Sequence, residues 1–203
     1  MEGYALQKKM FTISNINSPY KRRSKKKKAP QIYTVEEFME FFKYISNLDI
    51  HKEKAVSSVK EVLLKSLQNN SRNAFYNRYE SVWLYTLVHL NNAWRHWDCM
   101  QIPRINFEGT GIVDSIEWIQ NHELSIEDAK KIIRKIQIKN LKHSKTGANR
   151  YFYCSEQLIL PIAYAAVLCE IRARILNPLS DSLIDFQSKN RQLTSYPYKA
   201  FFD

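Results

Sequence analysis

The sequence predicts a mainly α-helical protein with a small β-hairpin, an α+β fold. Several segments repeat apolar residues at helical spacing, and two of them begin with a capping box. One pair of short segments rich in β-branched and aromatic residues flanks a glycine-containing turn, which is typical of a hairpin. A length of 203 residues with 44% hydrophobic content suffices for one domain plus tails.

The first helix is predicted to begin at Thr34, in the stretch "TVEE". Thr34 suits the N-cap, and Glu37 lies three residues on, at the spacing of a capping box. The apolar residues that follow recur at helical spacing, and they are Phe38, Phe41, Phe42 and Ile45.

Two further helices are predicted before the tryptophan-rich stretch at 90–100. One spans about 54–68. Its apolar residues fall on one face, and they are Val56, Val59, Leu63 and Leu67. The polar run at 69–73 ends it. The next helix spans about 74–92 and is apolar nearly all round in its second half, so we expect it at the centre of the core.

A capped helix and the hairpin are predicted downstream. Ser125 suits the N-cap of a helix over 125–136, with Asp128 at the capping-box position. The segments 136–143 and 150–154 flank the turn "SKTGAN", and we expect them to pair as two strands.

A long apolar helix is predicted over 156–175, with Ser155 as its cap. Pro161 should either kink this helix or mark its true start, because proline lacks the backbone N–H that a helix interior needs. The part that follows, 177–203, is predicted to be loop-like and ends on an aromatic cluster.

The positive charge is concentrated near the N-terminus. The formal net charge is +11, and residues 1–30 hold nine Lys and Arg against one acid, which leaves about +3 for residues 31–203. We therefore divide the chain into a basic tail or interdomain linker, 1–30, and a body, 31–203. The block "KRRSKKKK" at 21–28 suits a solvated spacer or a polyanion clamp. We favour the clamp, because neutralised phosphates release counterions.

Metal, cofactor and membrane chemistry find little support in the sequence. The cysteines Cys99, Cys154 and Cys169 lie far apart, which indicates reduced thiols in a cytoplasmic protein. The five histidines show no metal-ligand spacing and no glycine loop suits a phosphate, so we expect no metal and no small-molecule cofactor. The longest apolar run, 158–169, is too short to cross a bilayer.

Two cations are candidates for chemistry. Arg95 lies in the tryptophan-rich stretch "LNNAWRHWDCM", and Lys145 lies in the hairpin turn. If both met on one surface, they would suit an oxyanion or a phosphate. Each also has a plain interpretation, Lys145 as an ordinary turn lysine and Arg95 as an internal charge paired with Asp98 or another acid.

Three stretches, in this order, resemble the tyrosine recombinases, the phage integrase family. "KKKKAPQIYTVEEFMEFF" is similar to the family's basic linker entering the first helix of the catalytic domain. "TLVHLNNAWRHWDCMQIPRINF" resembles the first arginine box, Gly-x-Arg-x-x-Glu, with Ala93 for Gly and Asp98 for Glu. "LKHSKTGANRYFYCSEQLILPIAYA" resembles the hairpin that carries Lys-Thr-Gly-x-x-Arg. The resemblance covers roughly residues 18–203.

The resemblance implies a catalytic-domain fold in which Arg95 and Lys145 are catalytic. In the family a tyrosine attacks a DNA backbone phosphate, arginines and the lysine stabilise the transition state without a metal, and the lysine protonates the leaving 5′ oxygen. Asp98 would hold Arg95 in place. Double-stranded DNA and other recombinase protomers would be the partners of a cytoplasmic, DNA-associated protein. The residues expected to contact DNA are Lys21, Arg22, Arg23, Lys25, Lys26, Lys27, Lys28, Lys142 and Arg150.

Parts of the family's pattern are missing. No histidine has an arginine three residues on, so the second box, His-x-x-Arg, is absent. The nucleophile would follow that box, and Tyr196 and Tyr198 are poor candidates. Residues 108–135 resemble an insertion between Arg95 and Lys145. The chain is then a fragment of a larger recombinase with a catalytic domain incomplete at its C-terminus, which we favour, or a degenerate protein that only binds DNA. In both cases we expect no DNA cleavage by this chain alone.

Two other functions stay open from the sequence. The chain could be a non-enzymatic basic protein that binds nucleic acid or an acidic partner through residues 21–28, with a structural helical body. It could also associate with a membrane surface through the same block, although no amphipathic anchoring helix lies beside it. The recombinase interpretation requires Arg95 and Lys145 on one positively charged face. The first alternative expects Arg95 buried against an acid.

Overall fold

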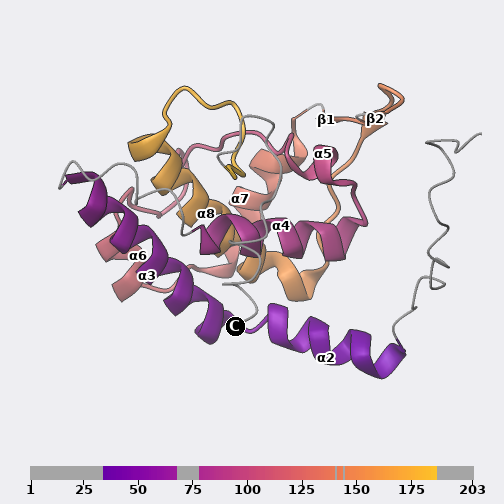
Figure 1. The fold of residues 1–203 in the computed structure, drawn as a ribbon, viewed down its shortest axis with the longest axis horizontal. Coiled ribbons are helices and arrows are strands. Elements are labelled where there is room, and N and C mark those ends of the chain that lie inside the picture. Colours follow the sequence, from indigo (N-terminus) through magenta and orange to yellow (C-terminus); the bar gives the residue numbers. More distant parts are fainter. Residues whose placement is uncertain (1–33, 68–77, 140, 144, 187–203) are drawn as a thin grey trace, which may run out of the picture. The chain divides into compact units, whose positions relative to one another are not determined.

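The computed structural model describes residues 34–67, 78–139, 141–143 and 145–186, with elements labelled in Figure 1. In this described part the chain is mainly helical with one small antiparallel sheet, as the sequence predicts. The elements are α2 (Val35–Ile45), α3 (Leu48–Leu67), α4 (Tyr79–Asn92), α5 (His96–Cys99), α6 (Ile116–Asn121), α7 (Ile126–Gln137), β1 (Leu141–Lys142), β2 (Asn149–Arg150), the 3₁₀ turn η2 (Glu156–Leu158) and α8 (Ile159–Leu176).

The chain divides into two units, Met1–Phe38 and Met39–Asp203. In the first unit, the predicted capping box at Thr34 is confirmed. The Thr34 N–H donates to Glu37 Oε2 at 2.8 Å, and the Glu37 N–H donates to Thr34 Oγ1 at 3.2 Å. The predicted basic tail and its block at 21–28 lie outside the described residues. All packing below belongs to the second unit.

Helix α3 begins earlier than predicted. The sequence placed its start near residue 54, whereas α3 starts at Leu48, directly after Asn47, whose Oδ1 accepts a hydrogen bond from the Ile50 N–H at 3.3 Å. His51, in the first turn of α3, is completely buried. Because it is polar, a search for apolar residues at helical spacing does not include this turn. At the other end, Leu67 is 81% exposed and does not belong to the core.

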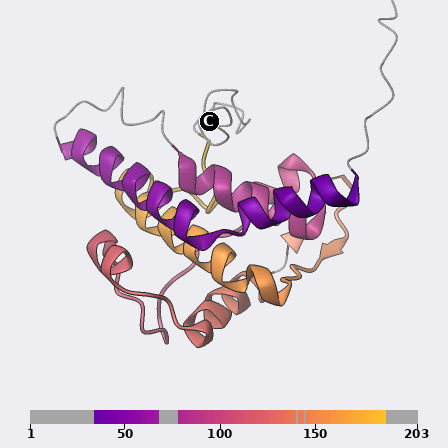
Figure 2. The same ribbon diagram turned by 90° about the horizontal axis from the view of Figure 1, so that it is seen from below.

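Helices α4 and α8 form the centre of the core. α8 is buried from Pro161 to Ala173. It contacts α3, α4 and α7, and Figures 1 and 2 show it running among these helices. The central position predicted for the helix over 74–92 is confirmed, because α4 is buried at most positions from Tyr79 to Val88, and the predicted start at 74 lies outside the described residues. Glu156–Leu158 form a separate 3₁₀ turn, and α8 starts at Ile159. Pro161 therefore lies in the first turn of α8, where its missing N–H costs no hydrogen bond.

Helix α7 confirms the predicted helix over 125–136, while α6 was not predicted. The Asp128 N–H donates to Ser125 Oγ at 3.1 Å, which caps α7. The residues that α7 buries are Ala129, Ile132, Ile133 and Ile136. α6 has six residues, too few for a clear apolar period, and it is capped by Ser115 Oγ, which accepts from the Trp118 N–H.

The β-hairpin is confirmed but is shorter than predicted. β1 and β2 pair antiparallel, with Leu141 opposite Arg150. Each strand has two residues, whereas the predicted segments were 136–143 and 150–154. The first segment was predicted too long because α7 continues through Gln137.

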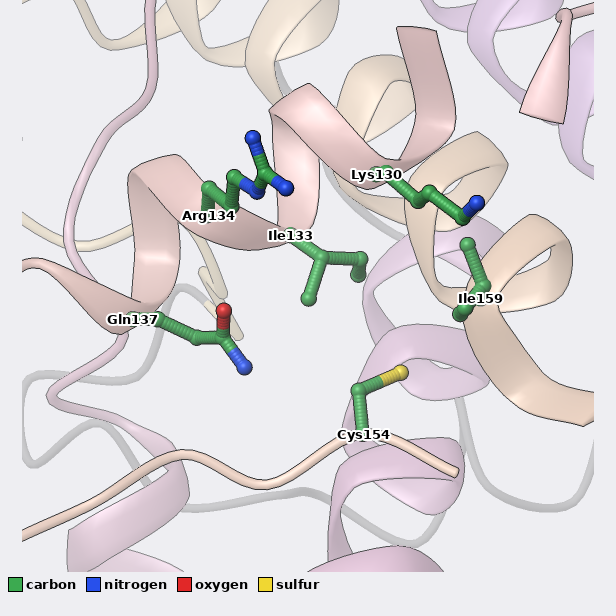
Figure 3. A pocket seen from close by; sticks show the side chains of 6 residues that line it. All are labelled: Lys130, Ile133, Arg134, Gln137, Cys154 and Ile159. Atoms are coloured by element: carbon green, nitrogen blue, oxygen red, sulfur yellow. The ribbon is translucent and has the colours of Figure 1, made fainter. Parts of the chain in front are cut away.

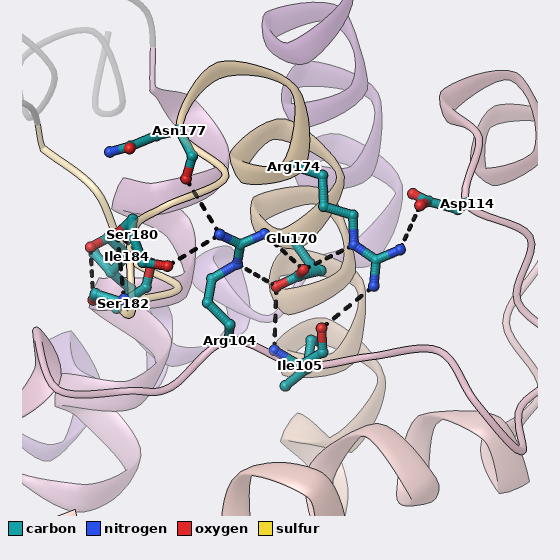
Figure 4. Close-up of polar contacts among 9 residues, drawn as sticks. All are labelled: Arg104, Ile105, Asp114, Glu170, Arg174, Asn177, Ser180, Ser182 and Ile184. Carbon is teal, nitrogen blue, oxygen red and sulfur yellow. Dashed lines mark hydrogen bonds and ion pairs between the residues drawn. The ribbon is translucent and has the colours of Figure 1, made fainter.

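A buried carboxylate ties the C-terminal part of the described chain to the core (Figure 4). Glu170 is 2% exposed and accepts hydrogen bonds from the Arg104 guanidinium at 2.7 and 2.8 Å and from Arg174 Nε at 2.9 Å. Arg104 Nη1 also donates to the carbonyls of Asn177 and Ser180. Burial raises the pKa of Glu170, but the hydrogen bonds from the two arginines lower it below its usual value.

Candidate nucleic-acid interface

The tryptophan-rich stretch that carries Arg95 forms a corner between two helices. α4 ends at Asn92, and Ala93 takes the left-handed conformation (φ 50°, ψ 34°), with its N–H donating to His89 O at 2.8 Å. Arg95 is then the N-cap residue of α5. Trp94 is buried, whereas Arg95 is exposed. We call residues 93–98 the corner.

Asp98 holds Arg95 through its backbone rather than its side chain. Asp98 Oδ2 accepts a hydrogen bond from the Arg95 N–H at 3.3 Å, which helps to cap α5. The guanidinium paired with Asp98 belongs to Arg150, with 2.7 Å between Nη2 and Oδ2. This corrects the expectation that Asp98 braces the Arg95 side chain. The Arg95 side chain has no ion pair within the described residues.

Arg150 lies inside the protein rather than on its surface. Its side chain is 9% exposed and pairs with Asp98, whose side chain is fully buried. The Arg150 guanidinium lies 4.9 Å from the centre of the Trp94 ring, and Phe152 packs edge-on against the same tryptophan at 5.7 Å. Arg150 Nη1 is buried without a hydrogen-bond partner in the described part of the chain. Arg150, which the sequence placed among the DNA contacts, thus makes an internal contact that joins β2 to the corner.

Residues 149–155, which we call the arm, leave the hairpin and are held by the end of α4. Asn91 Nδ2 donates to the carbonyl of Tyr153, and Asn91 Oδ1 accepts from the Ser155 N–H at 3.2 Å. Asn92 Oδ1 accepts from the Tyr153 N–H at 3.1 Å. The side chains of Asn91, Asn92 and Asp98, which flank Arg95 in the sequence, therefore all hold the arm in place.

The hairpin presents its two lysines to solvent. Lys142 on β1 and Lys145 in the turn are both exposed. His143 shapes the turn, because its Nδ1 accepts from the Lys145 N–H at 3.2 Å and its carbonyl accepts from the Gly147 N–H at 2.8 Å. Within the described residues no hydrogen bond joins Lys145 to Arg95. The corner and the hairpin that carry them are nevertheless bound together by the arm.

Sequence reasoning missed a second concentration of positive charge, in the body of the protein. Residues 129–155 contain eight Lys and Arg and no Asp or Glu. The near balance of residues 31–203 as a whole hides this stretch, because acids predominate elsewhere. A charge count in a sliding window along the sequence is the signal that finds it. We call residues 129–155 the acid-free stretch.

A small hollow opens beside α7 (Figure 3). Its volume is about 140 Å³, and its lining residues are Lys130, Ile133, Arg134, Gln137, Cys154 and Ile159. Sites for organic ligands are typically about 300–1,000 Å³, so the hollow is too small for one. Burial raises the pKa of Cys154 to about 11, so its thiol is protonated and a poor nucleophile. The candidate site that the sequence indicates is the exposed surface of the corner and hairpin, which carries Arg95, Lys142 and Lys145.

Metal and thiol chemistry find no site in the part of the chain that the structure describes. There, no group of three His, Cys, Asp or Glu side chains could hold a metal ion. Cys99, Cys154 and Cys169 are all free thiols, and burial raises the pKa of Cys99 to about 12. Among the same residues, no helix has both the length and the apolar character that a bilayer crossing needs.

No family model, curated protein or solved structure matches this chain. The choice between functions therefore depends on the residues of the corner and the hairpin and on what they can bind.

Proposed function

We propose that this chain is the DNA-binding part of a tyrosine-recombinase-like catalytic domain, in which Arg95 and Lys145 face a backbone phosphate of double-stranded DNA. The observation that carries the proposal is the buried Asp98–Arg150 ion pair, which fastens the hairpin bearing Lys145 to the corner bearing Arg95. Both cations stay exposed, so each is free to meet a bound polyanion.

The two cations suit different tasks at one phosphate. The Arg95 guanidinium can donate two parallel N–H bonds to the non-bridging oxygens. The Lys145 ammonium can stabilise developing charge and give a proton to the leaving 5′ oxygen, as the resemblance to the recombinases implies. Fixing the two on docked segments would lower the cost of arranging them around the transition state. Tyr196 and Tyr198 lie outside the described residues.

The exposure of Arg95 weighs against a purely structural role for the corner. That alternative expected Arg95 to be buried against an acid, and the arginine buried there is Arg150 instead. The absence of His-x-x-Arg from the sequence favours a second candidate, a non-enzymatic protein that binds DNA through the basic residues 21–28 and whose helical body is purely structural. Both candidates bind DNA, and they differ in whether the corner touches it.

Equilibrium binding to a short DNA duplex at several salt concentrations tests the proposal. We expect the logarithm of the affinity to fall linearly with the logarithm of salt concentration, because bound phosphates release counterions. Deleting residues 21–28 should lower affinity strongly. Arg95→Ala and Lys145→Ala should each lower it only a few-fold, since each removes one contact among several. A chain that fails to bind duplex DNA at low salt contradicts the proposal.

Photocrosslinking separates the two candidates. A photoreactive amino acid at position 97, where Trp97 is 46% exposed beside Arg95, should crosslink to the duplex. The same amino acid at position 67, where Leu67 is 81% exposed at the end of α3, serves as the control and should not. Equal yields at both positions, or none at position 97, would leave only the basic tail as the DNA contact.

A further inference from the structure

Helix α7 and the hairpin give the acid-free stretch a fixed support. α7 buries Ile132, Ile133 and Ile136, contacts α8, and is capped by Ser125. β2 is held to the corner by the pair Asp98–Arg150. The backbone positions that carry the exposed side chains are therefore fixed relative to the corner.

Four of the eight cations in the acid-free stretch form an ion pair or a side-chain hydrogen bond within the protein. Their partners are side-chain oxygens 2.6–3.3 Å away, and the pairs are Lys130–Glu127, Lys131–Asp128, Lys135–Asn106 and Arg150–Asp98. Lys135 also donates to the Glu108 carbonyl at 2.7 Å. These four charges are already engaged and are poorly placed to hold a ligand.

The other four cations follow one another from the last turn of α7 to the hairpin turn. They are exposed and have no side-chain hydrogen bond or ion pair within the described residues, and they are Arg134, Lys139, Lys142 and Lys145. In Figure 3 the Arg134 guanidinium points away from Cys154. The α7 dipole favours a cation near the helix C-terminus, which accounts for Arg134 but gives no reason for the lysines of the hairpin.

We infer that Arg134, Lys139 and Lys142 form a second phosphate-binding edge, which extends the contact with the DNA backbone beyond Arg95 and Lys145. The inference rests on the proposed function, since it requires the hairpin to meet duplex DNA. Arg134 and Lys139 are its new members, because neither lies in the stretches that resemble the recombinases.

Nucleic acid fits this edge better than a lipid surface does. Helices that lie on membranes present an apolar face to the lipid. The apolar face of α7 is buried in the protein core and is not available for that purpose. Cations on a rigid edge suit a row of phosphates, each of which releases counterions when it is neutralised.

Two triple variants with the same change in net charge test the inference in the full chain. The edge variant combines Arg134→Gln, Lys139→Gln and Lys142→Gln and leaves Lys145 intact. The control variant on α3 combines Lys52→Gln, Lys54→Gln and Lys60→Gln. For the edge variant we expect the slope of log affinity against log salt to shrink by about 2–3, because each lost phosphate contact removes roughly 0.9. For the control variant we expect a change below about 1.

The outcomes separate the inference from the proposed function. The edge is overturned if both triple variants lose the same amount of salt-dependent slope, or if the edge variant loses none. In either case the proposed function stands as long as the wild-type chain binds the duplex. A wild-type chain that does not bind duplex DNA overturns both. Thermal unfolding of each variant shows whether it folds.

A second test adds one negative charge beside the edge and leaves every cation in place. Ile138 is 75% exposed next to Lys139, so Ile138→Glu and Ile138→Gln should fold alike. We expect Ile138→Glu to bind the duplex about fivefold more weakly than Ile138→Gln, which corresponds to one repulsion near the surface. The same pair of substitutions at Leu67 should differ by less than about twofold.

Vesicles of phosphatidylserine and phosphatidylcholine distinguish the source of the phosphate. If Ile138→Glu weakens vesicle binding and leaves duplex binding unchanged, the edge is a lipid surface and the inference is wrong. If neither substitution at position 138 changes duplex binding, the edge does not touch DNA.

Discussion

At the scale of single residues, the conformation of Ala93 directs the two side chains that follow it. The left-handed turn at Ala93 ends α4 and lets Trp94 enter the core while Arg95 faces solvent. That conformation costs an L-residue with a Cβ roughly 1–2 kcal/mol, and glycine adopts it readily.

Ala93→Gly should therefore stabilise the protein. We expect the free energy of unfolding to rise by about 1 kcal/mol, which corresponds to roughly 2–4 °C in Tm for a chain of this size. Urea or thermal unfolding measures the change. The control is Ala173→Gly in α8, where the backbone is helical and the same substitution should lower stability by about 1 kcal/mol. A destabilised Ala93→Gly protein contradicts the left-handed turn.

His51 makes stability depend on pH. It is fully buried, with Nε2 2.9 Å from the Tyr44 carbonyl and Nδ1 2.7 Å from the Tyr79 hydroxyl. Because a carbonyl only accepts, Nε2 carries the hydrogen and Nδ1 accepts from Tyr79. Burial lowers the pKa of His51, with a further lowering from Lys54, although the hydrogen bond to Tyr44 raises it. The folded state therefore favours neutral His51.

The sign of the pH effect follows from that lowered pKa. Above pH of about 6.5 both folded and unfolded chains hold a neutral histidine, and stability is full. As pH falls below that value, the unfolded chain binds the proton first, so the free energy of unfolding drops. Urea midpoints between pH 7.5 and 5.5 should show this drop. His51→Gln should flatten it, whereas His122→Gln, at an exposed histidine, should keep it.

At the scale of elements, the two-stranded hairpin depends on the corner for its place. β1 and β2 pair over two residues each, and an isolated hairpin of any length is marginal in water. The arm is held by Asn91, Asn92, Trp94 and Asp98, which surround Arg95 in the sequence. The local sequence predicted the hairpin, but nothing in it indicated where the hairpin would dock.

Removing one partner of the pair Asp98–Arg150 should destabilise the protein strongly. Asp98→Asn leaves a buried guanidinium without its counter-charge, and Arg150→Met leaves a buried carboxylate, so each should cost about 3 kcal/mol or more. The double variant should cost less than the sum, with a coupling energy of about 1–3 kcal/mol. Chemical denaturation measures all three. Lys142→Met, on the same hairpin but exposed, should stay within about 0.5 kcal/mol. Additive single effects would show that the pair does not bind the two elements together.

At the scale of the whole molecule, positive charge lies in two stretches. Residues 1–30 and residues 129–155 each carry +8, so the remaining residues carry −5 of the net +11. Among those remaining residues, some acids are buried against arginines, such as Glu80 against Arg172 and Glu170 against Arg104. Charge of one sign concentrated in this way attracts a polyanion and speeds its association.

The chain as a whole should bind DNA without cutting it. The sequence lacks His-x-x-Arg, so the second arginine that would share the transition-state charge is missing. On a suicide duplex, whose cleaved fragment diffuses away, we expect no covalent protein–DNA adduct on a denaturing gel. A native gel of the same samples should show the complex. A covalent adduct formed by this chain would overturn the expectation.

The sequence by itself determined the helices with strong local signals and the existence of the hairpin. The capping box at Thr34 and the N-cap at Ser125 were predicted and confirmed, because a cap is a contact between residues three apart. The start of α3 and the whole of α6 were missed. A buried histidine interrupts the apolar pattern of α3, and α6 is shorter than two helical turns.

Only the tertiary structure decided which arginine is buried and which is exposed. Arg95 and Arg150 are both arginines near aromatic residues, and the sequence suggested that Asp98 pairs with Arg95. The left-handed turn at Ala93 points Arg95 outward, and the hairpin brings Arg150 onto Asp98 from 52 residues along the chain. Ion pairs between distant segments depend on where the backbone places them, and local patterns do not encode that placement.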